Sequence, residues 1–179
     1  VLITGGAGAV GYYGIQLAKW SGASVIATVS GDEKAAVASN AGADLIINYR
    51  DEDVVAAIED FTNGEGVDRI LEVEFGGNLS VSEQVIKSNG TIASYGSVAV
   101  IEPTLPFYNF MFKGVKLNTY LIYIVSESDR NTIVNGLNAA MNDRALTHLV
   151  TESYALDDIV NAHLSMESNR VIGNIVVGI

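Results

Sequence analysis

The sequence predicts an α/β fold, a doubly wound, mostly parallel six-stranded sheet with helices on both faces. Three observations predict it. A glycine-rich turn joins the apolar segment Val1 to Ile3 to a helical pattern, and short apolar segments then alternate with further helical patterns. Of the 179 residues, 49% are hydrophobic, enough for a buried core. We therefore expect a Rossmann-type domain over residues 1–145, followed by a tail over 146–179 in which strands and helices no longer alternate regularly.

The glycine-rich turn has the G-x-G-x-x-G spacing of a dinucleotide-binding site. The first glycine allows a tight turn, the second lets the backbone approach a pyrophosphate, and the third lets helix and strand pack closely. The phosphates then lie on free N–H groups at a positive helix end. The alternative is a glycine turn without a ligand. The candidate cofactor-binding residues of this turn are Gly6, Gly8, Ala9, Val10 and Gly11.

The remaining elements follow from apolar periodicity and from turn residues. The first helix ends at Ser21-Gly22, and a sheet order of 3-2-1-4-5-6 places the last strand on an edge. Ser126 begins a helix whose expected buried face is Ile133, Leu137, Ala140 and Met141. The expected strands are 24–29, 45–49, 67–73, 91–95 and 116–124, and the expected helices between them include 32–40, 51–61 (with Asp51, Glu52 and Asp53 in its first turn) and 74–87.

The residue at the end of the second strand selects the cofactor, because it faces the adenosine ribose. An NAD enzyme usually has Asp or Glu there, whereas this chain has Ser30, with Lys34 one turn later. A hydroxyl donor and a positive charge suit a 2′-phosphate, so we expect NADP (NADPH). The alternative is that Ser30 to Glu33 form a capping box that starts the next helix without any ligand.

Two residues at the end of the third strand lie near the adenine and the 2′-phosphate in this fold. Tyr49 either stacks on the cofactor or caps the sheet edge, and Arg50 is interpreted as a surface charge. On the other side of the crevice, the nicotinamide half should border Val73 to Gly77, and its glycines should leave space for a flat ring. The candidate residues there are Val73, Tyr95, Gly96 and Ser97.

The sequence supplies no candidate catalytic residue and no candidate metal ligand. Glu72 and Glu74 lie on the same side of a strand without a base to pair with, and His148 and His163 are interpreted as structural. The chain has no Cys, so it has neither disulfides nor thiolate metal sites.

Charge and hydropathy exclude other classes of partner. The net charge of −11 disfavours nucleic acid, and no apolar run approaches the ~18 residues of a membrane span. We expect a cytoplasmic protein. Because Val1 already lies in a strand and is not Met, we treat the chain as a fragment. The long apolar edge strand 116–124 is an aggregation hazard unless it is paired, so we expect a homodimer through it.

Taken together, these residues resemble the cofactor-binding half of the medium-chain dehydrogenase/reductase superfamily, in its zinc-independent quinone oxidoreductase (zeta-crystallin-like) branch. The stretches that carry the resemblance are GGAGAVG (5–11), IQLAK (15–19), the turn 30–34, AGAD with INYR (41–50), GVD (66–68), GTIASYG (90–96), AHLSMES and VIGNIVV.

The resemblance implies hydride transfer from NADPH to a quinone or enone, with Lys34 and Tyr49 at positions that hold the 2′-phosphate. It also implies a homodimer through the sixth strand. The amino-terminal substrate domain is absent, so the tail over 146–179 is expected to pack on that missing domain and the fragment alone to catalyse little. The family's tail strand has G-K where this chain has Gly173-Asn174, which removes any cofactor contact assigned to that lysine.

Three alternatives remain from the sequence. The turn also fits T-G-x-x-G-x-x-G of extended short-chain dehydrogenases, but those need a Lys four residues after a Tyr, and the nearest pair here, Tyr108 and Lys113, has the wrong spacing. The second alternative is a non-catalytic, crystallin-like module that holds NADPH. The third is the enoyl reductase module of a larger synthase.

Overall fold

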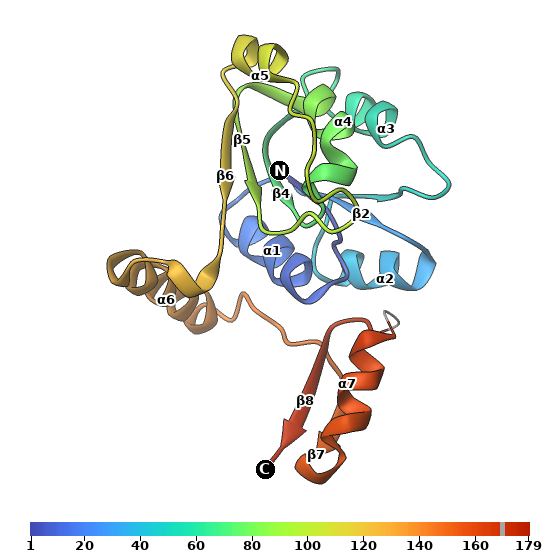
Figure 1. Cartoon of the computed structure of the whole chain (residues 1–179), viewed down its shortest axis with the longest axis vertical. Coiled ribbons are helices and arrows are strands. Elements are labelled where there is room, and N and C mark those ends of the chain that lie inside the picture. The colour runs from blue at the N-terminus through green and yellow to red at the C-terminus, as the bar shows by residue number, and fades with distance from the viewer. Residues whose placement is uncertain (169–170) are drawn as a thin grey trace.

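The computed structural model describes residues 1–168 and 171–179. Its centre is a six-stranded sheet with strand order β3-β2-β1-β4-β5-β6, in which all neighbouring strands are parallel (Figure 1). The predicted fold and strand order are therefore confirmed. The strands are β1 (Leu2–Ile3), β2 (Ile26–Val29), β3 (Leu45–Asn48), β4 (Val67–Glu72), β5 (Ile86–Ser94) and β6 (Lys116–Thr119).

Helices cover both faces of the sheet, because successive residues of a strand point to opposite sides. Leu2 of β1 belongs to a core shared with α3 (Val54–Phe61), α4 (Phe75–Val85) and α5 (Phe107–Lys113). The next residue, Ile3, belongs to a second core with α1 (Ala9–Trp20) and α2 (Asp32–Asn40). Each fully buried Leu or Ile side chain contributes about 1.5–3 kcal/mol, so the two cores fix the sheet between its helix layers.

Some element boundaries differ from the prediction. Helix α3 begins at Val54, and Asp53 is its N-cap, accepting hydrogen bonds from the N–H groups of Val55 (3.0 Å) and Ala56 (3.1 Å). Asp51 and Glu52 therefore precede the helix and do not lie in its first turn. Strand β5 begins at Ile86, and α4 ends at Val85, two residues earlier than predicted.

The predicted sixth strand, 116–124, is shorter in the structure. Strand β6 lies on the sheet edge as expected but ends at Thr119, and Ile122–Ile124 form a short 3-10 helix, η1. The physical reason is the length of its neighbour: β5 ends at Ser94, whose carbonyl accepts the hydrogen bond from the N–H of Tyr120 (2.8 Å). Beyond this point the chain turns away, and residues 120–124 stay exposed.

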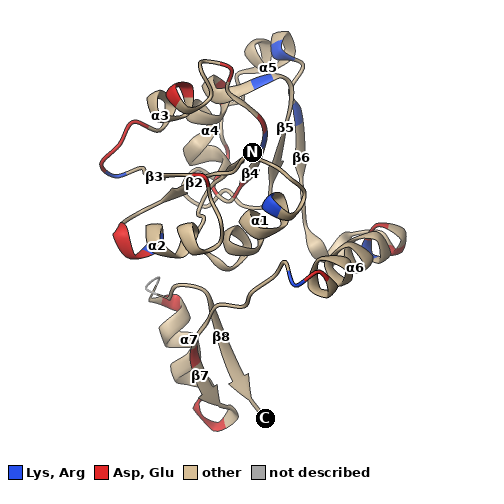
Figure 2. Ribbon diagram, turned by 180° about the vertical axis from the view of Figure 1, so that it is seen from behind, with Lys and Arg blue, Asp and Glu red and all other residues tan. Residues whose placement is uncertain are grey.

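Helix α6 (Glu127–Asn142) projects away from the sheet (Figures 1 and 2). Its predicted start is confirmed, because the Ser126 hydroxyl accepts a hydrogen bond from the N–H of Asp129 (3.1 Å). Its predicted buried face is wrong except for Ala140, since Ile133, Leu137 and Met141 are exposed. The reason is that α6 projects away from the sheet, so that no other element of the described chain covers its apolar side.

The tail forms a second, two-stranded parallel sheet of β7 (Val150–Ala155) and β8 (Asn174–Gly178). Between them lie the 3-10 helix η2 (Leu156–Asp158) and α7 (Ile159–Glu167). Thr147, just before this unit, is held by Gln16 of α1, whose Oε1 accepts a hydrogen bond from the Thr147 N–H (2.7 Å). Figure 2 shows Asp and Glu spread over α2, α3, α6 and the tail. In the described ranges no helix is long and apolar enough to cross a bilayer.

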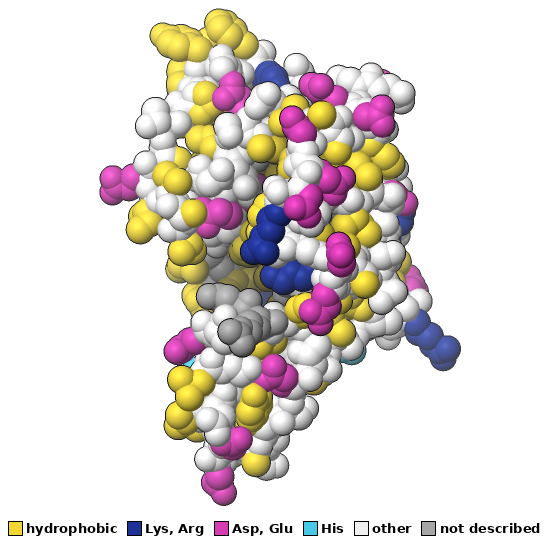
Figure 3. All heavy atoms as spheres, turned by 90° about the vertical axis from the view of Figure 1, so that its right-hand side faces the viewer, with side chains coloured by type: hydrophobic (Ala, Val, Ile, Leu, Met, Phe, Trp, Pro, Cys, Tyr) yellow, Lys and Arg dark blue, Asp and Glu magenta, His cyan; other side chains and the backbone are white. Residues whose placement is uncertain are grey.

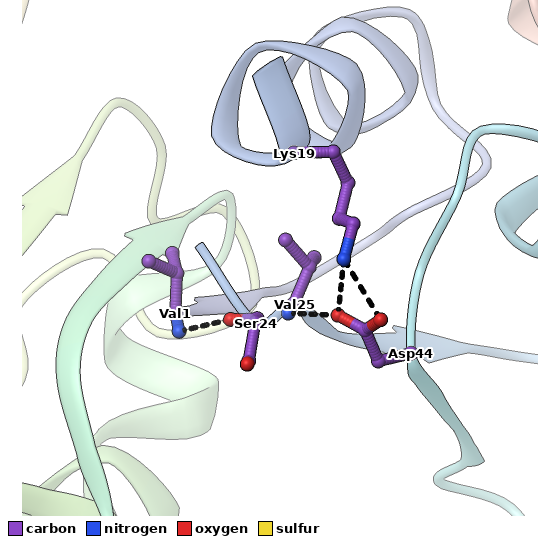
Figure 4. Close-up of polar contacts among 5 residues, drawn as sticks. All are labelled: Val1, Lys19, Ser24, Val25 and Asp44. Atoms are coloured by element: carbon purple, nitrogen blue, oxygen red, sulfur yellow. Dashed lines mark hydrogen bonds and ion pairs between the residues drawn. The ribbon is translucent and has the colours of Figure 1, made fainter. Parts of the chain in front are cut away.

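Asp44 ties helix α1 to strands β2 and β3 (Figure 4). Its carboxylate accepts two hydrogen bonds from Lys19 of α1 (both 2.8 Å) and one from the N–H of Val25 (2.7 Å). The hydrogen bond from Lys19 is the main cause that lowers the pKa of the Asp44 carboxyl, followed by the one from Val25. This contact links the C-terminal end of α1 to the start of β3, and the other end of α1 carries the glycine-rich turn.

Candidate cofactor site

The glycine-rich turn connects β1 directly to the N-terminus of α1. It is closed by hydrogen bonds from the Gly6 N–H to the Thr28 carbonyl (3.0 Å) and from the Gly8 N–H to the Gly5 carbonyl (2.9 Å). Gly11 is buried against the first part of the turn: a Cβ built on it lies 2.2 Å from the Gly5 oxygen. The turn therefore requires glycine here.

The other turn residues, Gly8, Ala9 and Val10, are exposed at the start of α1. An exposed first turn of a 12-residue helix presents backbone N–H groups and a partial positive charge, which is the arrangement that binds a pyrophosphate. The glycine-rich turn and the start of α1 thus fit the pyrophosphate of a dinucleotide through backbone groups alone.

A hollow of about 400 Å³ lies beyond the end of β2 and is bordered by Ser30, Lys34 and Arg50. Figure 3 shows basic side chains gathered in a hollow of this face, with acidic side chains around them. The Lys34 ammonium donates a hydrogen bond to the Ser30 hydroxyl (3.0 Å). Arg50, interpreted as a surface charge, is exposed in the structure and also lines this hollow.

The capping-box alternative for Ser30 does not match the geometry. The N-cap of α2 is Gly31, and within the described part of the chain no side chain makes a capping hydrogen bond there. The Ser30 hydroxyl accepts from Lys34 instead. The same hollow is also bordered by Asp32, Glu33 and Ile172, the last from the segment leading into β8.

A second cavity, of about 350 Å³, lies at the carboxyl ends of β1, β2 and β4. This is the point where the strand order reverses, and ligands of open parallel sheets bind there. Tyr49 is half exposed and borders this cavity, whereas Lys34 and Arg50 border the hollow beyond β2. The residues that line the cavity from strand ends and turns include Thr4, Gly5, Thr28, Tyr49, Val73, Glu74, Gly77 and Ala99.

Glu72 is a fully buried carboxylate at the side of this cavity. Its Oε1 accepts hydrogen bonds from the Thr4 hydroxyl (2.8 Å), the Glu74 N–H (2.7 Å) and the Asn78 amide (2.8 Å). It thus joins the end of β1 to the turn before α4. Sequence reasoning assigned Glu72 no role, although one acidic residue in an otherwise apolar strand end is the signal that indicates it.

Only one of the residues predicted to border the nicotinamide half, apart from the glycines, lies at this cavity. Val73 lines it, whereas Tyr95, Gly96 and Ser97 do not. Tyr95 is partly buried, and burial raises its pKa to about 12, with a further contribution from the charge of Glu72. The phenol is thus a neutral donor at physiological pH.

The expected space over the glycines after β4 is filled at Gly76 and open at Gly77. A Cβ on Gly76 lies 2.2 Å from the Val100 carbonyl oxygen and 2.8 Å from the Ser97 hydroxyl. We call residues 96–100 the strap, because they run across this turn. The room at Gly76 is therefore taken by a non-local segment, whereas Gly77 borders the open cavity of about 350 Å³, and room for a flat ring there stays a prediction.

Among residues 1–168 and 171–179, no group of three His, Asp or Glu side chains is placed to hold a metal ion. His148, interpreted as structural, accepts or donates a hydrogen bond at Nδ1 with the Tyr13 hydroxyl (2.7 Å).

Comparison with known proteins places this geometry in a family. The family model described as zinc-binding dehydrogenase matches residues 9–137. The chain is 30% identical over 181 aligned residues to 2-haloacrylate reductase of a Burkholderia species, covering 99% of this chain and 54% of that protein. It is 27% identical to a highly reducing polyketide synthase of a Dothideomycetidae species, covering 99% of this chain but 7% of the synthase.

A solved structure shows the same arrangement. Quinone oxidoreductase of Escherichia coli complexed with NADPH has a TM-score of 0.84 and 26% identity, over 99% of this chain and 56% of that one. The chain spans about half the length of the quinone oxidoreductases and the haloacrylate reductase it matches. The chain therefore belongs to the zinc-binding dehydrogenase family, as the nucleotide-binding part of a quinone oxidoreductase-like member of the medium-chain dehydrogenase/reductase superfamily.

Proposed function

We propose that this chain binds NADPH and is the cofactor-binding part of an oxidoreductase that transfers hydride from NADPH to a quinone or an enone. The observation that carries the proposal is the hollow bordered by Ser30, Lys34 and Arg50 beyond the end of β2, the strand whose Thr28 carbonyl accepts the Gly6 N–H of the glycine-rich turn. The Ser30 hydroxyl and the two cations suit a 2′-phosphate, whereas Asp32 and Glu33, which border the same hollow, oppose it. At the strand-end position itself, where this chain has Ser30, a carboxylate would instead suit the free ribose of NAD.

In this proposal, different residues bind different parts of the cofactor. The exposed first turn of α1, at Ala9 and Val10, binds the pyrophosphate through backbone N–H groups, since the Gly8 N–H is already donated to the Gly5 carbonyl. Lys34 and Arg50 neutralise the 2′-phosphate, and Tyr49 lines the cavity toward the sheet. The cofactor supplies the hydride, while this chain orients it and excludes water. The chain offers no group that we propose as a general acid or base.

The substrate class is supported by the relatives. One is a quinone oxidoreductase, and another has a name that places an alkene beside a carboxylate. Both substrates accept hydride at an electron-poor carbon. We also propose that the parent protein works without zinc and in the cytoplasm, as the resemblance to the zinc-independent quinone oxidoreductase branch implies.

A second candidate function is an enoyl reductase module of a larger synthase. The match to the polyketide synthase, which covers 99% of this chain, favours it. The two candidates differ in the length of the whole polypeptide, which mass spectrometry of the native protein measures.

The assembly proposed from the sequence is a homodimer through the edge of the sheet. Two observations support this dimer. Strand β6 is an edge strand of the sheet, and residues 120–124 that follow it are apolar and more than half exposed. We also propose that the unit 146–179 packs on a substrate domain outside this chain. Supporting this, Leu156, Val160 and Leu164 are more than half exposed on one side of the unit.

The test is calorimetric titration of the chain with NADPH and NADH, repeated on Lys34→Ala and Arg50→Ala. Loss of one charge-assisted contact lowers NADPH affinity about tenfold and leaves NADH binding nearly unchanged. Arg130→Ala is the matched control, because it removes a positive charge from the exposed α6. Equal affinity of the parent chain for both cofactors would contradict the proposed phosphate site.

A further inference from the structure

Glu72 brings a negative charge to the wall of the 350 Å³ cavity. Its side chain is fully buried and borders that cavity. Oε1 accepts hydrogen bonds from three neutral donors, the Thr4 hydroxyl, the Glu74 N–H and the Asn78 amide, and Oε2 accepts one from the Ser82 hydroxyl (3.4 Å). A carboxylate whose partners all donate is in its ionised form. Neutral donors stabilise this charge without cancelling it.

Within the described chain, no cation lines the cavity beside this charge. The lining residues include two carboxylates, Glu72 and Glu74, and none of those described is Lys, Arg or His. Burial would raise the pKa of the Glu74 carboxyl, but backbone N–H groups of the strap, together with that of Gly77, outweigh it and hold the pKa below its ordinary value. Both carboxylates therefore make the cavity negatively charged.

The charge of Glu72 acts on the side of the crevice where the nicotinamide half is expected. The Glu72 carbonyl accepts a hydrogen bond from the Tyr95 N–H (3.1 Å), so the ends of β4 and β5 lie together. Burial raises the pKa of the Tyr95 phenol to about 12, and the negative charge of Glu72 contributes to the increase. Val73, the next residue, and Gly77 line the cavity itself. A ring bound on this side lies in the field of Glu72.

The charge of the nicotinamide ring changes in the reaction proposed above. NADPH gives up a hydride, one proton with two electrons, to an electron-poor centre of the quinone or enone. One C–H bond breaks at the ring, a bond to hydrogen forms on the substrate, and the substrate then takes a proton from water. The ring, neutral before the transfer, is left with one positive charge. A fixed negative charge nearby stabilises that positive charge, most strongly where water is excluded.

We propose that the buried carboxylate of Glu72 favours the oxidised, positively charged form of the bound cofactor over the reduced, neutral form, and so promotes hydride donation. The inference rests on the proposed NADPH binding, with the ring on the Val73 and Gly77 side of the cavity. Glu72 acts through its charge and does not take part in proton transfer. Adenosine and phosphates are common to both forms, so the ratio of the dissociation constants for NADP⁺ and NADPH isolates the effect of this charge.

The experiment compares the parent chain with Glu72→Gln and Glu83→Gln. Glu72→Gln removes the charge and keeps the size and the Oε1 acceptor, and its new amide faces the Ser82 hydroxyl, which can accept a hydrogen bond. Glu83 of α4 does not line the cavity, so Glu83→Gln is the matched control. Calorimetry measures the dissociation constants of NADP⁺, NADPH and adenosine 2′,5′-bisphosphate, which has no nicotinamide ring. Thermal unfolding shows that each variant is folded.

In Glu72→Gln, the dissociation constant of NADP⁺ divided by that of NADPH should rise on the order of tenfold, as for one charge removed at roughly 10 Å with an effective dielectric constant of about 20. Tenfold corresponds to about 30 mV in the potential of a two-electron couple. The affinity for the bisphosphate should not change, and Glu83→Gln should keep the ratio of the parent chain. Glu74→Gln should raise the ratio in the same direction, and it tests the same field if Glu72→Gln does not fold.

An unchanged ratio in both cavity variants, with NADPH still bound, would overturn this inference and leave the proposed function standing. A ratio that rises equally in Glu83→Gln would overturn it too, because the effect would then not come from the cavity. A changed affinity for the bisphosphate with an unchanged ratio would place the adenine, and not the nicotinamide, beside Glu72. If the parent chain binds neither NADPH nor the bisphosphate, the proposed function and this inference both fail.

Discussion

Replacing Gly11 with Ala tests whether the turn is held by backbone-to-backbone contact. The new methyl group would lie 2.2 Å from the Gly5 oxygen and 2.9 Å from the Gly6 Cα, both main-chain atoms that no side-chain rotation can move. Ordinary contact requires the backbone to open by roughly 1 Å, which in a packed turn costs about 3 kcal/mol. We expect the melting temperature to fall by roughly 10 °C and NADPH binding to be lost.

Gly136→Ala is the matched control, because it makes the same chemical change in a helix. A Cβ built on Gly136 of α6 has no atom within 4 Å among those of the described chain. This substitution should therefore stabilise the protein by about 0.5–1 kcal/mol. Urea unfolding of both variants checks the pair. A Gly11→Ala variant as stable as the parent would refute the argument that close approach requires glycine in this turn.

Two further predictions concern the fold and the assembly. Asp44→Ala should cost about 1 kcal/mol at pH 7, since Asp44 and Lys19 are each about a third exposed. Lys19 and the Val25 N–H lower the pKa of Asp44 in the folded state. The contribution of Asp44 to the free energy of unfolding is therefore present above ~pH 4 and is lost as the pH falls through the pKa of the folded state. In urea unfolding, the difference in stability between the variant and the parent should shrink as the pH is lowered through this range. Ile122→Asp should shift the mass in sedimentation from dimer to monomer, whereas Ile179→Asp should not; a parent chain that is already monomeric would contradict the proposed dimer.

Much of the fold could be predicted because its determinants are local. The glycine spacing and the alternation of apolar segments with helical patterns are read within windows of about ten residues. The strand order then follows from the parallel architecture. The meeting of Ser30 with Lys34 was predictable in the same way, because the two residues lie one helical turn apart.

The missed features depend on contacts between distant segments. Residues 97–100 reach Gly76 and Glu74 across more than 20 positions, and no local pattern indicates that a loop fills this space. Arg50 joins Lys34 only because β2 and β3 are neighbours. The end of β6 at Thr119 is set by the length of β5, whereas its own sequence continues to favour a strand. Such contacts override local propensity.

The two-residue strand β1 has a consequence for how the chain folds. It lies in the middle of the sheet, and its pairing with β4 joins residues such as Thr4 and Glu72, which are 68 positions apart. The pairings among β1, β2 and β3 join residues that are closer in sequence, so we expect the pairing of β1 with β4 to form more slowly. The cavity at the carboxyl ends of β1 and β4 lies on this seam. A newly made chain therefore acquires this cavity only when the two halves of the sheet dock, and a ligand that contacts both halves would stabilise the docked state.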